Sequence, residues 1–96
     1  MIEIRLTETF AEWLADLRDR RAAARIAERL GRLALGNPRD VKPVGEGLSE
    51  LRIDFGPGYR VYYIQRGVVL IVVLCSGDKS SQDRDIVRAK ALAKEM

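Results

Sequence analysis

The hydrophobic positions along the chain change from a two-residue period to a helical period and back again. Residues 2–6 alternate apolar with polar and predict a short, half-buried strand. Apolar residues recur at i, i+3, i+4 and i+7 over residues 10–17, and a similar spacing continues over 23–34, which predicts two helices. The second helix is expected to end at the Gly-Asn-Pro sequence of residues 36–38. The first third of the chain is therefore predicted to form a strand followed by a helical hairpin.

The rest of the chain predicts a loop, three strands and a last helix. Proline and glycine in residues 38–47 indicate a loop. Strands are expected at 50–55, 59–65 and 68–75, a polar loop at 76–81, and a helix from about 82 to 94. Because residues 68–75 are apolar on both faces, this strand should lie inside the sheet. The predicted class is α+β, with the N-terminal strand and helical hairpin packed on a twisted antiparallel sheet and a C-terminal helix, in one domain over residues 1–96.

Composition limits the chemistry available to the chain. The 96 residues carry a formal net charge of +3 and contain no histidine and one cysteine. The absence of histidine excludes His-based triads and ordinary zinc sites, and neither a metal nor another cofactor is expected. Cys75 lies in an apolar run and is expected to be a buried structural thiol. With no signal peptide and no long apolar run in this sequence, a cytoplasmic location without membrane contact is expected.

The strands flanking Gly56-Pro57-Gly58 contain the candidate site. If this reversal is tight, Arg52 faces Tyr62 and Asp54 faces Arg60. Alternation places these four side chains on one face of the sheet. Surface ion pairing is an equally good explanation of Asp54 and Arg60. The opposite face is expected to pack on the helices through the following residues: Leu51, Ile53, Phe55, Val61 and Tyr63.

The loop before the last helix adds further polar residues to this end of the sheet. Lys79 follows the inner strand, and Gln82, Asp83 and Arg84 begin the helix, whose free N–H groups favour phosphate. RNA cleavage by its own 2′-hydroxyl needs stabilisation of charge on phosphorus and proton transfer at two oxygens. Fixed arginines suit the first task. Lys79 or Tyr62 is a candidate for the proton transfers.

Two segments resemble the RelE/ParE toxin superfamily when taken together: ELRIDFGPGYRVYY at 50–63 and SGDKSSQDRDI at 76–86. Both are similar to the subgroup called addiction-module killer proteins, which is related to HigB-type and phage Gp49-like toxins. The resemblance covers nearly the whole chain. It implies a helical hairpin on a twisted antiparallel sheet. It also implies a toxin kept silent by a cognate antitoxin, often a helix-turn-helix protein.

The resemblance also implies roles for particular residues. RelE-type members cut mRNA in the ribosomal A site with basic residues on the sheet face. Arg60 matches the arginine after Gly-Tyr that lies near the scissile phosphate, Arg52 lies close to a basic strand position, and Lys79 matches a basic residue before the last helix. The predicted catalytic set is thus Arg52, Arg60, Tyr62 and Lys79, with Arg52, Arg60, Lys79, Gln82 and Arg84 as the RNA-binding set. The chain departs from some RelE members in having no tyrosine after Tyr63.

Three functions remain open from the sequence. The first is a ribosome-dependent mRNA endonuclease that inhibits translation, with ribosome, mRNA and antitoxin as partners. The second is a ParE-like protein that poisons DNA gyrase without cutting RNA, because the same fold supports both activities. The third is an inactive relative that only binds its antitoxin.

Overall fold

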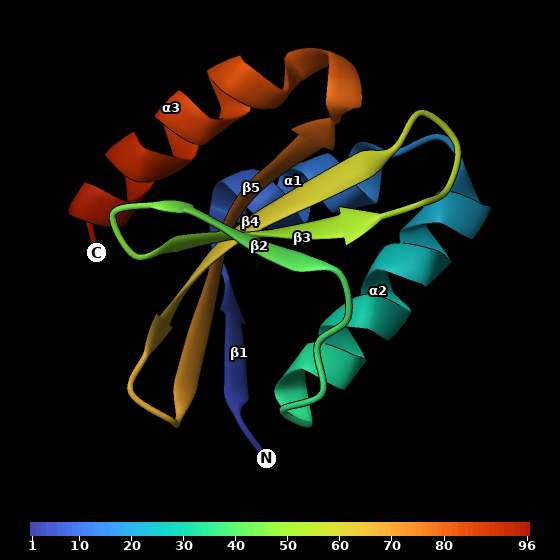
Figure 1. Cartoon of the computed structure of the whole chain (residues 1–96). Helices are drawn as coiled ribbons and strands as arrows, with labels where there is room; N and C mark the ends of the chain where they lie inside the picture. Colours follow the sequence, from blue (N-terminus) through green and yellow to red (C-terminus); the bar gives the residue numbers. More distant parts are fainter.

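The computed structural model describes all 96 residues and has a five-stranded sheet with helices on both faces (Figure 1). The elements follow in the order β1 (Glu3–Leu6), α1 (Glu8–Asp16), α2 (Arg20–Ala34), β2 (Val41–Gly45), β3 (Leu48–Ile53), β4 (Tyr59–Arg66), β5 (Leu70–Asp78), a 3₁₀ turn (Lys79–Ser81) and α3 (Gln82–Lys94). The strand order across the sheet is β1-β5-β4-β3-β2. Strand β1 runs parallel to β5, and every other pair is antiparallel. The predicted α+β class is confirmed.

Helices α1 and α2 cover one face of the sheet, as the alternation predicts. Their buried residues Phe10, Ile26 and Leu33 belong to one core cluster with alternate residues of the sheet. The sheet residues of this core are Leu51, Ile53, Tyr59, Val61, Tyr63, Ile71 and Val73. This larger core fixes the orientation of β3 and β4.

Helix α3 covers part of the other face. It buries Ala89 against Tyr62, Ile64 and Leu74 in a second, smaller cluster. Figure 1 shows α3 lying across one end of the sheet, on the side opposite to α1 and α2. The face that carries Arg52 and Arg60 is therefore apolar under α3 and polar where α3 begins. None of the three helices is both long and apolar enough to cross a lipid bilayer.

Several predicted element boundaries are wrong. Residues 41–45, predicted as loop, form edge strand β2, where Pro43 is tolerated because an edge strand can leave one side of its backbone unpaired. Val68 and Val69, predicted to begin an inner strand, lie in the turn before β5 and are exposed. At its other end β5 continues through Asp78, past the predicted end at Cys75. The strand does lie inside the sheet, between β1 and β4.

The hairpin register also differs from the prediction. Arg52 faces Arg60, and Tyr62 faces Glu50. The reversal is wider than a tight turn, because β3 ends at Ile53 and β4 begins at Tyr59. A shift of two residues keeps every side chain on its predicted face. It changes which residues are neighbours, and this change defines the site.

Candidate functional site

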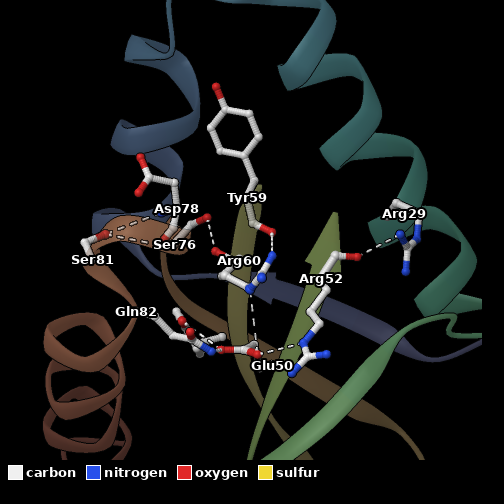
Figure 2. Close-up of polar contacts among 10 residues, drawn as sticks. Arg29, Glu50, Arg52, Tyr59, Arg60, Ser76, Asp78, Ser81 and Gln82 are labelled. Carbon is white, nitrogen blue, oxygen red and sulfur yellow. Dashed lines mark hydrogen bonds and ion pairs between the residues drawn. The ribbon is translucent and has the colours of Figure 1, made fainter. Parts of the chain in front are cut away.

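A buried carboxylate lies at the centre of the polar cluster (Figure 2). The side chain of Glu50, on β3, is 0% exposed. Its Oε1 accepts a hydrogen bond from Nε of Arg52 at 3.1 Å and lies 3.8 Å from Nε of Arg60. Its Oε2 accepts hydrogen bonds from the Tyr62 hydroxyl at 3.0 Å and from Nε2 of Gln82 at 2.8 Å. Glu50 therefore joins β3, β4 and the first turn of α3.

The surroundings of Glu50 keep it ionised. Burial alone raises the pKa of a carboxylic acid, because a charge loses its hydration. Hydrogen bonds from Gln82, Arg52 and Tyr62, together with the charge of Arg60, outweigh burial and hold the pKa of Glu50 below its usual value. The two arginines thus share one negative charge and keep a net positive charge between them.

Arg60 has hydrogen-bonding capacity that the chain does not use. Its side chain is 13% exposed and its Nη1 donates to the backbone oxygen of Tyr59 at 3.2 Å. Its Nε is buried and has no hydrogen-bond partner within normal distance. That Nε lies 3.8 Å from Oε1 of Glu50, so the donors left for a ligand are those of the outer guanidinium nitrogens, which make only the bond to Tyr59. Such donors favour an anion that can accept from them. Arg60 is thus a candidate anion-binding residue.

Arg52 lies opposite Arg60 and is more open to solvent, with 33% of its side chain exposed. Its backbone is fixed from the helical side, because Nη1 of Arg29 on α2 donates to the Arg52 carbonyl at 2.9 Å. The chain before β2 is held by the same guanidinium, which also donates to the Arg39 carbonyl. These contacts fix the position of β3 at the site (Figure 2).

Lys79 lies at the same end of the sheet as Arg60, because both approach Gly58 closely. Gly58 has a φ of +84°, which a residue with a side chain rarely adopts. A Cβ at this position would lie 3.5 Å from Cβ of Lys79 and 3.6 Å from Nη1 of Arg60. The structure therefore brings Arg52, Arg60 and Lys79 to one end of the sheet. Lys79 is exposed in the 3₁₀ turn that Asp78 caps by accepting from the Ser80 backbone.

Gln82 and Arg84, two predicted RNA-binding residues at the start of α3, lie in different surroundings. Gln82 uses its amide on Glu50, so it supports the arginines instead of presenting that donor to a ligand. Arg84 is exposed and lines, with Lys79, an open hollow of about 300 Å³ at the helix start. Arg84 and Lys79 are thus the cations at this end of α3 that remain available to a ligand.

Tyr62 does not have the surroundings of a proton-transfer group. It is fully buried under α3, and its hydroxyl donates to Glu50. Burial and the charge of Glu50 raise the pKa of Tyr62 far above its usual value. The structure therefore argues against the predicted catalytic role of Tyr62 and gives it a role in holding Glu50.

The predicted pairing of Asp54 with Arg60 is wrong. Asp54 follows the end of β3 and is exposed, and the carboxylate near Arg60 is that of Glu50. The prediction omitted Glu50, although alternation places it on the same face as Arg52. A glutamate two residues before Arg52, on the same face as Arg52 and Arg60, was the feature of the sequence that could have identified it.

The residues present suit phosphate better than a metal. No group of three or more His, Cys, Asp or Glu side chains lies close enough to hold a metal ion. The end of the sheet presents Arg52, Arg60 and Lys79 instead, with Arg84 nearby. Such a set can bind phosphate oxygens and stabilise added negative charge on phosphorus.

Comparison with known proteins places this fold in a class. The structure is similar to a chain of the RelBE2 toxin–antitoxin complex from Mycobacterium tuberculosis, with a TM-score of 0.62 and 26% identity, over 81% of this chain and 98% of that chain. The protein therefore has the RelE-type toxin fold. The searched family models gave no match.

A close relative by sequence defines the family. A Haemophilus influenzae protein, described only as an uncharacterized protein, is 52% identical over 95 residues, which is 99% of this chain and 96% of the relative. The chain belongs to the same protein family as this Haemophilus influenzae protein.

Proposed function

We propose that this protein is the toxin of a toxin–antitoxin pair and that it cuts mRNA on the ribosome without a metal. The similarity to a chain of the RelBE2 complex supports the toxin function. The observation that supports the nuclease function is the guanidinium of Arg60, which makes one hydrogen bond and lies opposite Arg52. Both Arg60 and Lys79 approach Gly58 at the same end of the sheet. A cognate antitoxin of the helix-turn-helix class is the proposed partner, and the cytoplasm, where translation occurs, is the proposed location.

In the proposed reaction the RNA supplies its own nucleophile. The 2′-hydroxyl transfers its proton to a solvent water and attacks the adjacent phosphorus, and the bond to the 5′-oxygen of the next nucleotide breaks. The products are a 2′,3′-cyclic phosphate and a 5′-hydroxyl, so atoms balance without added water. Arg60 binds a non-bridging phosphate oxygen and stabilises its charge, with Arg52 beside it. Lys79 protonates the leaving oxygen.

Glu50, Tyr62 and Gln82 act as positioning residues in this proposal. Oε1 of Glu50 orients the guanidinium groups of Arg52 and Arg60. Tyr62 and Gln82 donate to Oε2 and so hold Glu50 in place. Such a preformed arrangement loses little free energy in reorganisation when charge develops on phosphorus. Because Glu50 neutralises one of the two arginine charges, a single net positive charge of this pair is left for the phosphate.

The burial of Tyr62 favours a second candidate function, which is poisoning of DNA gyrase without RNA cleavage. With Tyr62 buried, Lys79 is the one remaining proton-transfer residue of the predicted set. A protein that only binds its target needs the cations but not the proton transfers. The experiment must therefore separate these two activities.

Brief induction of the protein in bacteria, followed by primer extension on several mRNAs, tests the proposal. Wild-type protein is expected to produce new mRNA 5′ ends within coding regions, and Arg60→Ala is expected to reduce them on the order of a hundredfold. Arg18→Ala, which removes an exposed arginine without an ion pair, is the control and should cut like wild type. DNA damage with unchanged mRNA ends would instead identify the gyrase function, and harmless expression would identify an inactive relative.

A further inference from the structure

The end of β5 borders a hollow that the candidate site does not use. Strand β1 pairs with β5 only from Leu70 to Val73, so no strand covers the edge of β5 beyond Val73. Helices α1 and α3 lie on opposite faces of the sheet (Figure 1), and both line a hollow of about 360 Å³ at this edge. We call it the α1–α3 hollow, and its lining includes Trp13, Tyr59, Gly77, Arg84, Asp85 and Arg88.

The α1–α3 hollow is continuous with the candidate site. Gly77 faces Arg60 in the β4–β5 pair, and Oγ of Ser76, also in the lining, donates to the Arg60 carbonyl at 2.5 Å (Figure 2). Ser81 and Arg84 line both this hollow and the one beside Lys79. A nucleic-acid strand with one phosphate at Arg60 can therefore continue into the α1–α3 hollow.

Trp13 gives the hollow a fixed aromatic surface. Phe10 stacks on the indole at 6.0 Å between ring centroids, and Tyr59 meets it at 5.9 Å and a steep angle, so the ring is held in place. The indole is only half-buried, and it also lines a neighbouring hollow of about 240 Å³. An oriented, partly open indole is a surface on which a nucleobase can stack.

Charge differs between the two sides of the hollow. Arg84 and Arg88 lie one turn apart on α3, are exposed, and take part in none of the five ion pairs of the protein. On the α1 side, Glu12 and Asp16 line the neighbouring hollow. Phosphate is therefore favoured along α3 and disfavoured along α1, where carboxylates can instead accept from the N–H groups of a base.

A buried carboxylate in the lining retains acceptor capacity. Asp85 is 7% exposed, and its side chain accepts one hydrogen bond, from the Ser81 hydroxyl at 2.5 Å. It forms no ion pair, and its other oxygen accepts no hydrogen bond within the chain. Buried polar atoms are rarely left without partners, so this oxygen favours a ligand that presents an N–H group.

From this combination we infer that the α1–α3 hollow binds one nucleotide of an RNA strand that continues from the candidate site. Its base stacks on Trp13 and donates to Asp85, and its flanking phosphates pair with Arg84 and Arg88. The joint presence of an aromatic surface and free cations is typical of sites for single-stranded nucleic acid. The identity of the strand as mRNA rests on the proposed function, whereas the chemistry of the hollow does not.

Tryptophan fluorescence tests this inference directly, because Trp13 is the only tryptophan of the chain. The probe is a 2′-O-methyl RNA hexanucleotide, which lacks the 2′-hydroxyl and cannot be cut by the proposed reaction. It is expected to quench Trp13, and an abasic strand of the same length should bind at least about tenfold more weakly. No quenching, or equal binding of the abasic strand, would overturn the inference. Adenosine monophosphate binding as tightly as the hexanucleotide would overturn the assignment to an RNA strand.

The salt dependence of binding tests the two cations. Each phosphate contact on a single strand contributes about 0.7 to the slope of log K against log salt concentration, so Arg84→Ala with Arg88→Ala should reduce that slope by about 1.4. The control Arg21→Ala with Arg66→Ala removes two exposed arginines that line neither this hollow nor the one beside Lys79, and it should retain the slope. Equal slopes in the two double variants would overturn the role of the cations.

Substitution of Trp13 tests the aromatic surface, with binding of a labelled hexanucleotide followed by anisotropy. Trp13→Leu should weaken binding at least about tenfold, and Trp13→Phe, which keeps an aromatic ring, should recover most of it. Thermal unfolding of both variants checks that they are folded. Wild-type affinity in a folded Trp13→Leu protein would overturn the inference.

These outcomes are separable from those of the proposed function. Quenching by the hexanucleotide in a protein that cuts no mRNA would refute the nuclease function alone. Cleavage of mRNA by wild type and by Arg88→Ala alike, with no quenching of Trp13, would overturn this inference and leave the nuclease function standing.

Discussion

Replacing Glu50 with glutamine removes the charge at the centre of the site and nearly preserves its shape. Three surrounding groups donate hydrogen bonds to the carboxylate, Arg52 at Oε1 and Tyr62 and Gln82 at Oε2. The fourth, Arg60, pairs with Oε1 by charge at 3.8 Å. The amide of the variant would turn its oxygen to the arginines and its NH₂ to Tyr62 and Gln82. The tyrosine hydroxyl and the glutamine amide can turn to accept. The hydrogen bonds are thus largely retained, and the loss is the charge itself.

The expected loss of stability follows from this arrangement. Leaving a fully buried charge without its partner costs about 3–5 kcal/mol. Both arginines retain some contact with water, so the cost here is smaller, and we expect about 2 kcal/mol. In a domain of this size, that corresponds to a fall in Tm of roughly 8–16 °C. Glu28→Gln, at an exposed helical ion pair with Arg32, is the control and should change stability by less than about 0.5 kcal/mol.

The pH dependence of unfolding gives an independent readout. Because the folded pKa of Glu50 is lowered, its contribution to stability is complete above the unfolded pKa of about 4.3 and is lost as the pH falls through the lower folded pKa. Urea unfolding between pH 7 and pH 3 should show this loss in wild type and a shallower loss in Glu50→Gln. Equal stability at pH 7 and identical pH profiles for the two proteins would refute the reasoning.

Two further predictions concern the support of α3 and the buried thiol. Gly77→Ala should destabilise the protein by about 2–3 kcal/mol, because the added Cβ would lie 1.8 Å from Oδ2 of Asp85. Gly31→Ala, where nothing lies within 4 Å of the added Cβ, should stabilise α2 by roughly 0.5–1 kcal/mol. Thermal unfolding of both variants checks this prediction, and equal Tm values would contradict it. Burial raises the pKa of Cys75 to about 11, so iodoacetamide at pH 8 should alkylate the folded chain on the order of a hundredfold more slowly than the urea-unfolded chain. Similar rates in the two states would show that the thiol is accessible.

Much of the fold could be predicted from periodicity, because α1 and α2 have one continuous apolar face each, β3 alternates, and β5 is apolar on both faces. Edge strand β2 could not, since Pro43 and Gly45 are turn residues in most contexts and only the neighbouring β3 makes them a strand. Val68 and Val69 are apolar without being buried, so hydrophobicity alone placed the start of β5 too early.

The site could be predicted only in part. Alternation identified the face on which Arg52, Arg60 and Tyr62 lie, and this face is preserved by the two-residue change in register. The depth of each side chain depends on α3, which covers Tyr62 and brings Gln82 onto Glu50. Burial of this kind is a property of tertiary packing and leaves no periodic signal in one strand.

The most direct test of the nuclease function uses purified protein, ribosomes and a defined mRNA. Each new 3′ end is analysed for a cyclic phosphate. The proposal predicts a cut in the ribosome-bound mRNA with a 2′,3′-cyclic phosphate, lost in Arg60→Ala and retained in Arg18→Ala. Intact mRNA, or fragments with a 3′-hydroxyl and a 5′-phosphate, would contradict it.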